Sequence, residues 1–274
     1  MKRLPFSATA VGLILSFSLV QGVTAQDPPQ RSGAAMPQWA QPDPIVTEGV
    51  IEDGAIDAIK EMSNFLMTAN TLAITSQGSL DVVTNDGQRI QLDGTTTYKA
   101  RKPAGFVIDY QSDIKSRRFI YDGKTFTVYS PKLGYYSSVP APGTNKEVLD
   151  TIYNKYGIQL PLEDLFRWGD GTNADRIKAL KSAYEVGSAT IDGVETDHFA
   201  FREADVDWEV WIQKGAQAWP RKLVIVDRTD PARPTFTARL NWQMNPAFTD
   251  ADFTFVPDAN AKRIQIATYQ GSGE

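Results

Sequence analysis

The chain has 274 residues, with 28 basic and 33 acidic side chains, one histidine and no cysteine, so its net charge at neutral pH is −5. The acidic balance argues against binding to nucleic acid, whose phosphates attract basic surfaces. The lack of cysteine excludes disulfides, thiol chemistry and a lipid-anchoring cysteine, so the fold depends on a large hydrophobic core.

The first 25 residues have the pattern of a secretion signal. Lys2 and Arg3 precede an apolar stretch over residues 11–20, and the small residues of Val23–Ala25 suit a signal peptidase that cuts after Ala25. A membrane-spanning helix needs about twenty apolar residues, and this stretch has about half of that. Removal of 25 residues with two positive charges leaves 249 residues with 26 basic and 33 acidic side chains, a net charge of −7. We therefore expect a soluble periplasmic protein without a stable membrane anchor.

Residues 26–50 are rich in proline, glutamine and serine, which predicts a flexible leader. Trp39 is the one residue of this leader that we expect to dock. The domain itself is predicted over 51–274. It begins with an amphipathic helix, for which Asp53 is the expected N-cap. Apolar residues recur with a period of 3.6 and indicate one buried face, formed by Ala55, Ile56, Ile59, Met62, Phe65 and Leu66.

Strands follow the helix. Residues 72–82 alternate between apolar and polar side chains, and residues 235–242 do the same, so each predicts a strand with one buried face. Glycine tolerates the positive φ of tight turns, so Asp-Gly pairs predict consecutive antiparallel hairpins. These pairs are Asp86-Gly87, Asp93-Gly94, Asp122-Gly123 and Asp192-Gly193.

A helical insert interrupts the strands. Thr144 and Glu147 form a predicted capping box, and Gly157 can end that helix in a left-handed conformation. Pro161 opens a second short helix, and residues 172–175 can cap a third. The pattern favours a mainly β fold with helices (α+β): an incomplete antiparallel β-barrel of about eleven strands, with helices lying on its concave side like a lid.

The sequence contains few of the side chains that enzymes commonly use for catalysis. His198 is the only imidazole, it lies in a strand-like run, and no Gly-x-Ser-x-Gly sequence occurs. Asp205 and Asp207 alone do not indicate calcium, and we expect neither a metal nor a cofactor. A carboxylate-only enzyme would need two facing acids about 5–10 Å apart. The pairs Glu163 with Asp164 and Asp207 with Glu209 are better explained as solvated positions, so the sequence predicts no enzyme.

Aromatic and aliphatic side chains share faces of two predicted strands. Phe106, Ile108 and Tyr110 alternate along one strand, and Trp208 and Val210 along another, with Trp211 on the opposite face. Each of these residues on its own is explained by an ordinary core. As a set they also suit a half-closed barrel whose interior is larger than its own side chains fill.

A resemblance to known proteins is carried by two long stretches, which contain Lys102-Pro103, Phe106, Tyr121–Lys124, Phe126, Val128–Lys132, Tyr136, and then Trp219–Leu223, Trp242, Asn245-Pro246, Phe248, Phe253–Pro257, Ala261 and Ile264. A third stretch contains Asp192–Val194, His198, Phe201-Arg202, Asp207-Trp208 and Trp211-Ile212. The first two resemble the LolA/LolB-like superfamily of bacterial envelope proteins, and within it the third looks closest to an uncharacterised family of predicted periplasmic proteins. The resemblance implies an open β-barrel with a helical lid. In the superfamily the cavity takes up lipoprotein acyl chains, or the fold serves as a sensor domain for envelope stress.

We therefore predict a binding protein that holds a lipid, acyl chain or other hydrophobic ligand between sheet and lid. The alternative is an interaction or sensory module with a filled interior, whose partner is an envelope protein. The candidate cavity residues are Leu80, Phe106, Ile108, Leu149, Ile152, Trp168, Trp208, Val210, Leu223 and Leu240.

Overall fold

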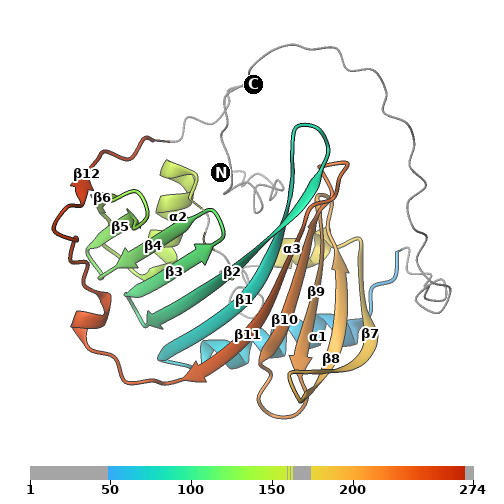
Figure 1. Ribbon diagram of the computed structural model, residues 1–274. Helices are drawn as coiled ribbons and strands as arrows, with labels where there is room; N and C mark the ends of the chain where they lie inside the picture. The colour runs from blue at the N-terminus through green and yellow to red at the C-terminus, as the bar shows by residue number, and fades with distance from the viewer. Residues whose placement is uncertain (1–48, 159, 161, 163–173, 269–274) are drawn as a thin grey trace.

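The computed structural model describes residues 49–158, 160, 162 and 174–268, and its centre is one sheet of twelve strands (Figure 1). The predicted signal sequence, the predicted leader up to residue 48 and most of the second predicted helix lie outside the described residues. The strands are β1 (Thr71–Val83), β2 (Arg89–Arg101), β3 (Phe106–Ser112), β4 (Ser116–Tyr121), β5 (Thr125–Ser130), β6 (Tyr135–Pro140), β7 (Ser182–Ile191), β8 (Val194–Arg202), β9 (Val206–Gln213), β10 (Pro220–Asp227), β11 (Thr235–Met244) and β12 (Lys262–Arg263).

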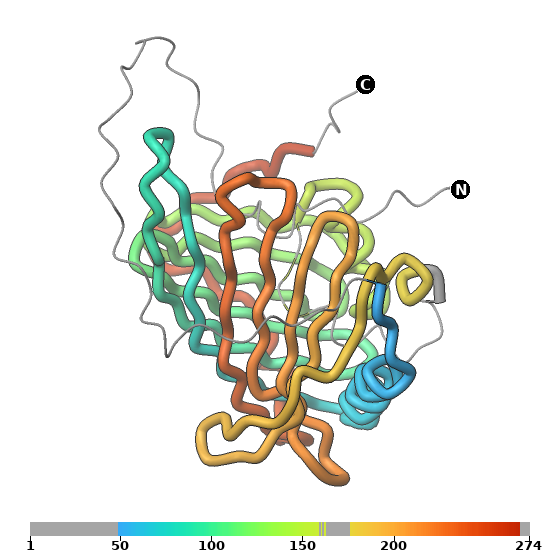
Figure 2. The backbone as a smooth tube through the Cα atoms, turned by 90° about the vertical axis from the view of Figure 1, so that its right-hand side faces the viewer, coloured from blue at the N-terminus to red at the C-terminus, as the bar shows by residue number. Residues whose placement is uncertain are grey.

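The strand order β12-β6-β5-β4-β3-β2-β1-β11-β10-β9-β8-β7 consists of two antiparallel meanders. The first runs from β1 to β6 and the second from β7 to β11, and pairing of β1 with β11 joins them. Figure 2 shows the two meanders as layers, one behind the other, because the sheet curls strongly. The sheet does not close into a barrel, since β7 and β12 are its edges. The predicted fold class is thus confirmed.

Helix α1 (Asp53–Met67) crosses the concave side of the second meander. The chain enters the helix beside β7, where Ile51 pairs with Ala183, and leaves it into β1. Fifteen residues of helix span about 22 Å, which matches about 24 Å for the five strand spacings from β7 to β1. The predicted apolar face is buried against the sheet, although Phe65 stays partly exposed and packs edge-to-face on Trp219.

Helix α2 (Asn145–Tyr156) and the short helix α3 (Ala174–Ala179) lie in the connection between β6 and β7, near opposite edges of the sheet. The capping box of Thr144 with Glu147 and the left-handed Gly157, with φ 65°, are both present as predicted. Asn145 fixes the start of α2: its Oδ1 accepts from Gly105 N at 2.8 Å and its Nδ2 donates to Arg101 O at 2.8 Å. The predicted helical insert between two strand-rich halves is confirmed.

The C-terminal segment, residues 245–268, covers the outer face of the first meander. Phe253, in a 3₁₀ turn over Asp250–Phe253, is fully buried in a second apolar cluster with Val107, Ile120 and Tyr129. Asp252 accepts from Lys99 Nζ at 2.8 Å, and this bond, together with hydrogen bonds from Thr249, lowers the pKa of the Asp252 carboxyl to about 2. The segment then adds β12 beside β6. This twelfth strand is parallel, whereas about eleven antiparallel strands were predicted.

Two sequence predictions of local structure were wrong. Asp93-Gly94 is not a turn, because Gly94 lies inside β2 and pairs with Gly78 of β1 and Ser112 of β3. The N-cap of α1 is Glu52, one residue before the predicted Asp53, and its carboxylate accepts from Glu185 N at 2.9 Å. In both cases a partner strand, which local sequence does not contain, decides the conformation.

Ser63 of α1 carries a buried hydroxyl whose energetic cost can be measured. Its side chain is fully buried, and among the described residues its Oγ has no hydrogen-bond partner. We expect Ser63→Ala to raise the free energy of unfolding by about 1–2 kcal/mol, because a buried unpaired hydroxyl is costly and alanine favours the helix. Urea denaturation measures the change. Asn64→Ala, at an exposed position of the same helix, isolates the gain from helix propensity. Equal gains in the two variants would mean that the hydroxyl carries no penalty.

Candidate functional site

The concave face of the sheet carries an unbroken apolar row across six strands. Directly paired residues share a face, so the ladder partners from β2 to β8 define this row. It comprises Leu92, Leu80, Phe236, Ile225, Trp208 and Phe201. The rings of Trp208 and Phe201 stack with centroids 4.0 Å apart. The row continues the apolar surface from one meander into the other, so the concave side is a single hydrophobic face.

Polar groups on this face are paired at its margins. Trp208 Nε1 donates to Glu203 Oε1 at 3.2 Å, and Arg176 of α3 donates to the same oxygen at 3.3 Å. This carboxylate is largely buried and connects α3 to the sheet. Burial raises the pKa of Tyr98, which lies on the concave face of β2.

Most predicted cavity residues lie together in one core. Seven of the ten are buried in a single cluster with the inner faces of α1 and α2, and Leu149 packs against that cluster half-buried. Leu80 is buried outside the cluster, near the β1–β2 hairpin, and Trp168 lies outside the described residues. The seven are Phe106, Ile108, Ile152, Trp208, Val210, Leu223 and Leu240.

Beneath α1 this core is closely filled by the chain itself. Ile59, Met62 and Leu66 of the helix and Val210 of β9 have exposed fractions of 0%. Such burial leaves no water contact for these side chains, and interiors of this kind are close-packed. A ligand that reaches Val210 must therefore displace part of this helical cover.

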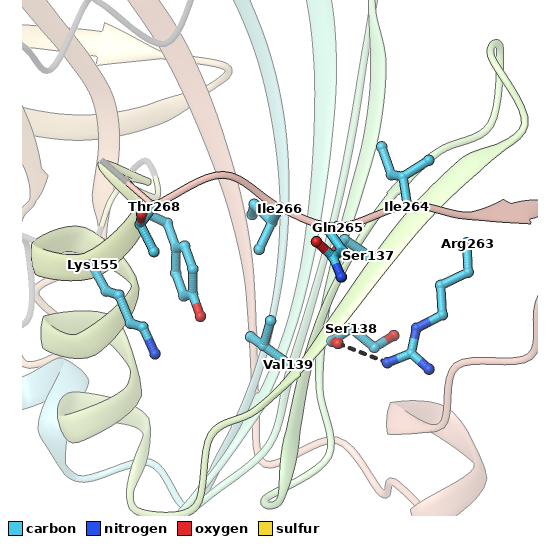
Figure 3. A pocket seen from close by; sticks show the side chains of 10 residues that line it. Ser137, Ser138, Val139, Lys155, Arg263, Ile264, Gln265, Ile266 and Thr268 are labelled. Carbon is cyan, nitrogen blue, oxygen red and sulfur yellow. Dashed lines mark hydrogen bonds between the residues drawn. The ribbon is translucent and has the colours of Figure 1, made fainter. Parts of the chain in front are cut away.

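An open pocket of about 640 Å³ lies at the β6 edge of the sheet, next to this core. We call it the edge pocket. Three segments line it: β6, the last turn of α2, and the C-terminal segment after it has passed the β6 edge (Figure 3). The lining residues are Ser137, Ser138, Val139, Lys155, Tyr156, Arg263, Ile264, Gln265, Ile266 and Thr268.

The β6 residues at the edge pocket have fixed partners. Val139 lies opposite Phe126 and packs against the main core. Ser138 Oγ is 2.8 Å from Thr127 Oγ1, and its carbonyl accepts from Arg263 Nη2 at 3.1 Å. The backbone N–H of Ile264 donates to Tyr136 O at 2.8 Å, which holds the C-terminal segment on this edge. Hydrogen bonds of the backbone therefore fix the positions of the β6 edge and of the C-terminal segment that line the pocket.

The sequence prediction did not include the edge pocket: none of the nine described candidate residues lines it. Its walls come from three segments that are distant in the chain, and only the C-terminal wrap brings them together. One signal was available. Ile264, Gln265 and Ile266 alternate like a half-buried strand, although the structure places only Lys262–Arg263 in β12.

Of the residues considered for catalysis, His198, Asp207 and Glu209 lie on the outer face, whereas Glu163 and Asp164 are outside the described residues. His198 Nε2 is 2.8 Å from Glu209 Oε2, and its ring stacks on Trp211 with centroids 3.8 Å apart. Lys222 Nζ lies 4.0 Å from the centroid of the same Trp211 ring, while Asp207 pairs with Arg202 at 2.6 Å. Within residues 49–158, 160, 162 and 174–268, no three His, Asp or Glu side chains gather in a metal-binding group. Over the same ranges, no helix has the length and hydropathy to cross a bilayer.

The model of a protein family described as "Predicted periplasmic protein (DUF2092)" matches residues 55–267. Solved structures of similar fold include an uncharacterised conserved protein from Thermus thermophilus, with 11% identity, 78% of this chain and 99% of that chain covered, and a TM-score of 0.46. The lipoprotein LppX of Mycobacterium tuberculosis has 12% identity, 72% and 99% coverage, and a TM-score of 0.42. A LolA superfamily protein from Nitrosomonas europaea has 8% sequence identity and a TM-score of 0.37, and the match covers 73% of this chain and 97% of that chain. The family match agrees with the predicted resemblance to an uncharacterised family of predicted periplasmic proteins. Comparison with curated proteins finds no match.

Proposed function

The chain belongs to the DUF2092 family of predicted periplasmic proteins, and from this we propose that it is a non-enzymatic binding protein of the periplasm. Its ligand, on this proposal, is a lipid, an acyl chain or another hydrophobic molecule held between the curved sheet and the helices. The periplasmic location itself follows from the family description and agrees with the location predicted from the sequence.

The edge pocket is the observation that carries this proposal. It is open to solvent, has a volume of about 640 Å³, and adjoins the apolar concave face through Val139. Ligand pockets are usually about 300–1,000 Å³. Ten buried methylene groups would contribute about 8 kcal/mol, which corresponds to a dissociation constant of about 1 µM before the entropic cost of binding. An acyl chain therefore needs no catalytic group to be held.

We propose that a long chain extends from the edge pocket beneath α2. Leu149 and Ile152 on the inner face of this helix and Phe106 and Ile108 on β3 would then contact it. Trp208, Val210, Leu223 and Leu240 lie deeper in the core, on β9, β10 and β11, and would be reached only by the longest ligands. Because the core is filled by the chain's own side chains, binding on this proposal requires that α2 moves away from the sheet.

Native mass spectrometry of the full chain purified from a periplasm tests the proposal. We expect an added mass of lipid, and uptake of a fluorescent fatty acid after delipidation. Ile266→Trp, which fills the edge pocket, should reduce uptake about tenfold or more. Val256→Trp is the matched control, because Val256 lies on the same segment, 76% exposed and away from the pocket. A clean apo mass together with no fatty-acid uptake would reject the proposal.

A second function is favoured by the filled core beneath α1. In this alternative the fold is an interaction or sensory module whose surface recognises an envelope protein. The fully buried Ile59, Met62 and Leu66 support it, because they leave no space for a ligand there. Cross-linking in cells that captures one stoichiometric partner, with no lipid in the native mass, would support the alternative over ligand carriage.

The domain boundaries are part of the proposal: a signal peptide over 1–25, a leader over 26–50 and the binding domain over 51–274. The same mass spectra test the first boundary, since cleavage after Ala25 gives a mature chain that starts at Gln26. A mature chain that still contains Met1 would contradict it.

A further inference from the structure

The edge pocket is basic although the protein is acidic. Its lining contains Lys155 and Arg263 and no carboxylate, whereas the whole chain has a net charge of −5. Neither cation forms an ion pair within the described part of the chain. Arg263 bonds only to the carbonyl of Ser138 through Nη2, and the Lys155 ammonium lies 5.5 Å from the ring centroid of Tyr156. Two positive charges are therefore available to a ligand.

Between these cations the lining includes apolar side chains beside the neutral polar Ser137 and Gln265. Figure 3 places Lys155 and Arg263 toward opposite sides of the pocket, with Val139 and Ile266 between them. The exposed side chain of Ile264 extends the apolar surface at the rim. A purely hydrophobic ligand would gain nothing from the cations, and a small free anion would gain nothing from the isoleucines. A ligand that combines both features fits the whole lining.

We propose that the edge pocket binds an amphipathic anion, whose carboxylate or phosphate contacts Arg263 and whose hydrocarbon part lies along Val139 and Ile266, toward the side where Lys155 lies. This inference rests on the proposed function and names the ligand class of the same site. Arg263 is the main partner for two reasons. Its planar guanidinium can bond an oxyanion through two N–H groups, and Lys155 lies in the last turn of α2, whose carbonyl end disfavours an anion.

Four probes test the inference by calorimetry on the delipidated full chain: dodecanoate, dodecyl phosphate, dodecan-1-ol and inorganic phosphate. We expect the two dodecyl anions to bind about five-fold more tightly than the alcohol because of Arg263, and more weakly as salt is added. Arg263→Gln should remove most of this difference and leave the affinity for dodecan-1-ol unchanged. Lys155→Gln should have the same effect to a smaller degree.

Lys262→Gln is the matched control. It removes the same charge from the adjacent residue, which is exposed and does not line the edge pocket. The control should bind all four probes like the wild type, and equal melting temperatures of the variants would exclude unfolding as the cause of any difference.

The failures of the two proposals are distinguishable. If dodecan-1-ol binds as tightly as dodecanoate, and Arg263→Gln changes neither, the headgroup inference is overturned while the hydrophobic site stands. If inorganic phosphate binds as tightly as dodecyl phosphate, the site is one for free anions and the amphipathic assignment is wrong. If no dodecyl probe binds at all, the proposed function fails as well.

Discussion

Replacement of Gly78 by alanine is expected to lower the free energy of unfolding by about 3 kcal/mol. A Cβ at this position would lie 2.6 Å from the carbonyl oxygen of Thr237 and 3.4 Å from the Cα of Ala238. Both are backbone atoms of β11, so the strain cannot be relieved by turning a flexible side chain, and overpacking of this kind typically costs about 1–3 kcal/mol or more. The effect is large because β1 and β11 form the pair that joins the two meanders.

Urea denaturation followed by far-UV circular dichroism measures this change. Gly54→Ala is the matched control: a Cβ there would meet nothing within 4 Å, and alanine in a helix is favoured over glycine by about 1 kcal/mol. The control should thus be as stable as the wild type or more stable. A Gly78→Ala protein with wild-type stability would mean that β1 and β11 separate easily, so the two halves are not one rigid sheet.

The same glycine illustrates how far local sequence predicts this fold. Alternation along residues 72–82 correctly indicated a strand with one buried face, and Gly78 fitted it as a small residue on that face. The reason for glycine there is the approach of β11, which begins more than 150 residues later. The predicted turn at Asp93-Gly94 was wrong for the same reason. An Asp-Gly pair predicts a turn when nothing else is known, but Gly94 lies opposite Gly78 in the ladder.

For the candidate site, the sequence likewise predicted which side chains face inward but not which segments meet. Side-chain parity correctly placed Phe106 and Ile108, and Trp208 and Val210, on inward faces, since parity needs only the period of a strand. Parity does not give the order of strands, nor the route of the C-terminal segment around β6. The edge pocket depends on both. Lys155 lies in α2, which follows β6, and Arg263 lies in the C-terminal segment that pairs with β6, so the two residues line one pocket only in the folded chain.

Ile152→Ala is expected to destabilise the packing of α2 by about 3 kcal/mol, within the usual range of about 2–5 kcal/mol for a buried isoleucine. Ile152 is fully buried on the inner face of the helix, against the main core. Tyr153→Ala is the control on the same helix, since Tyr153 is 44% exposed and should cost little. Hydrogen exchange of backbone amides measures the effect for each element separately.

The distribution of this effect decides between the two functions. If α2 is a lid that opens alone, its amides should exchange about 100-fold faster in Ile152→Ala, while those of α1 and of the β1–β11 pair keep their protection. That result supports a chain that admits its ligand beneath α2. If every protected amide is accelerated together, α2 belongs to one cooperative core that opens only on global unfolding. A core of that kind would be closed to an acyl chain, and the interaction module would be the better explanation of the fold.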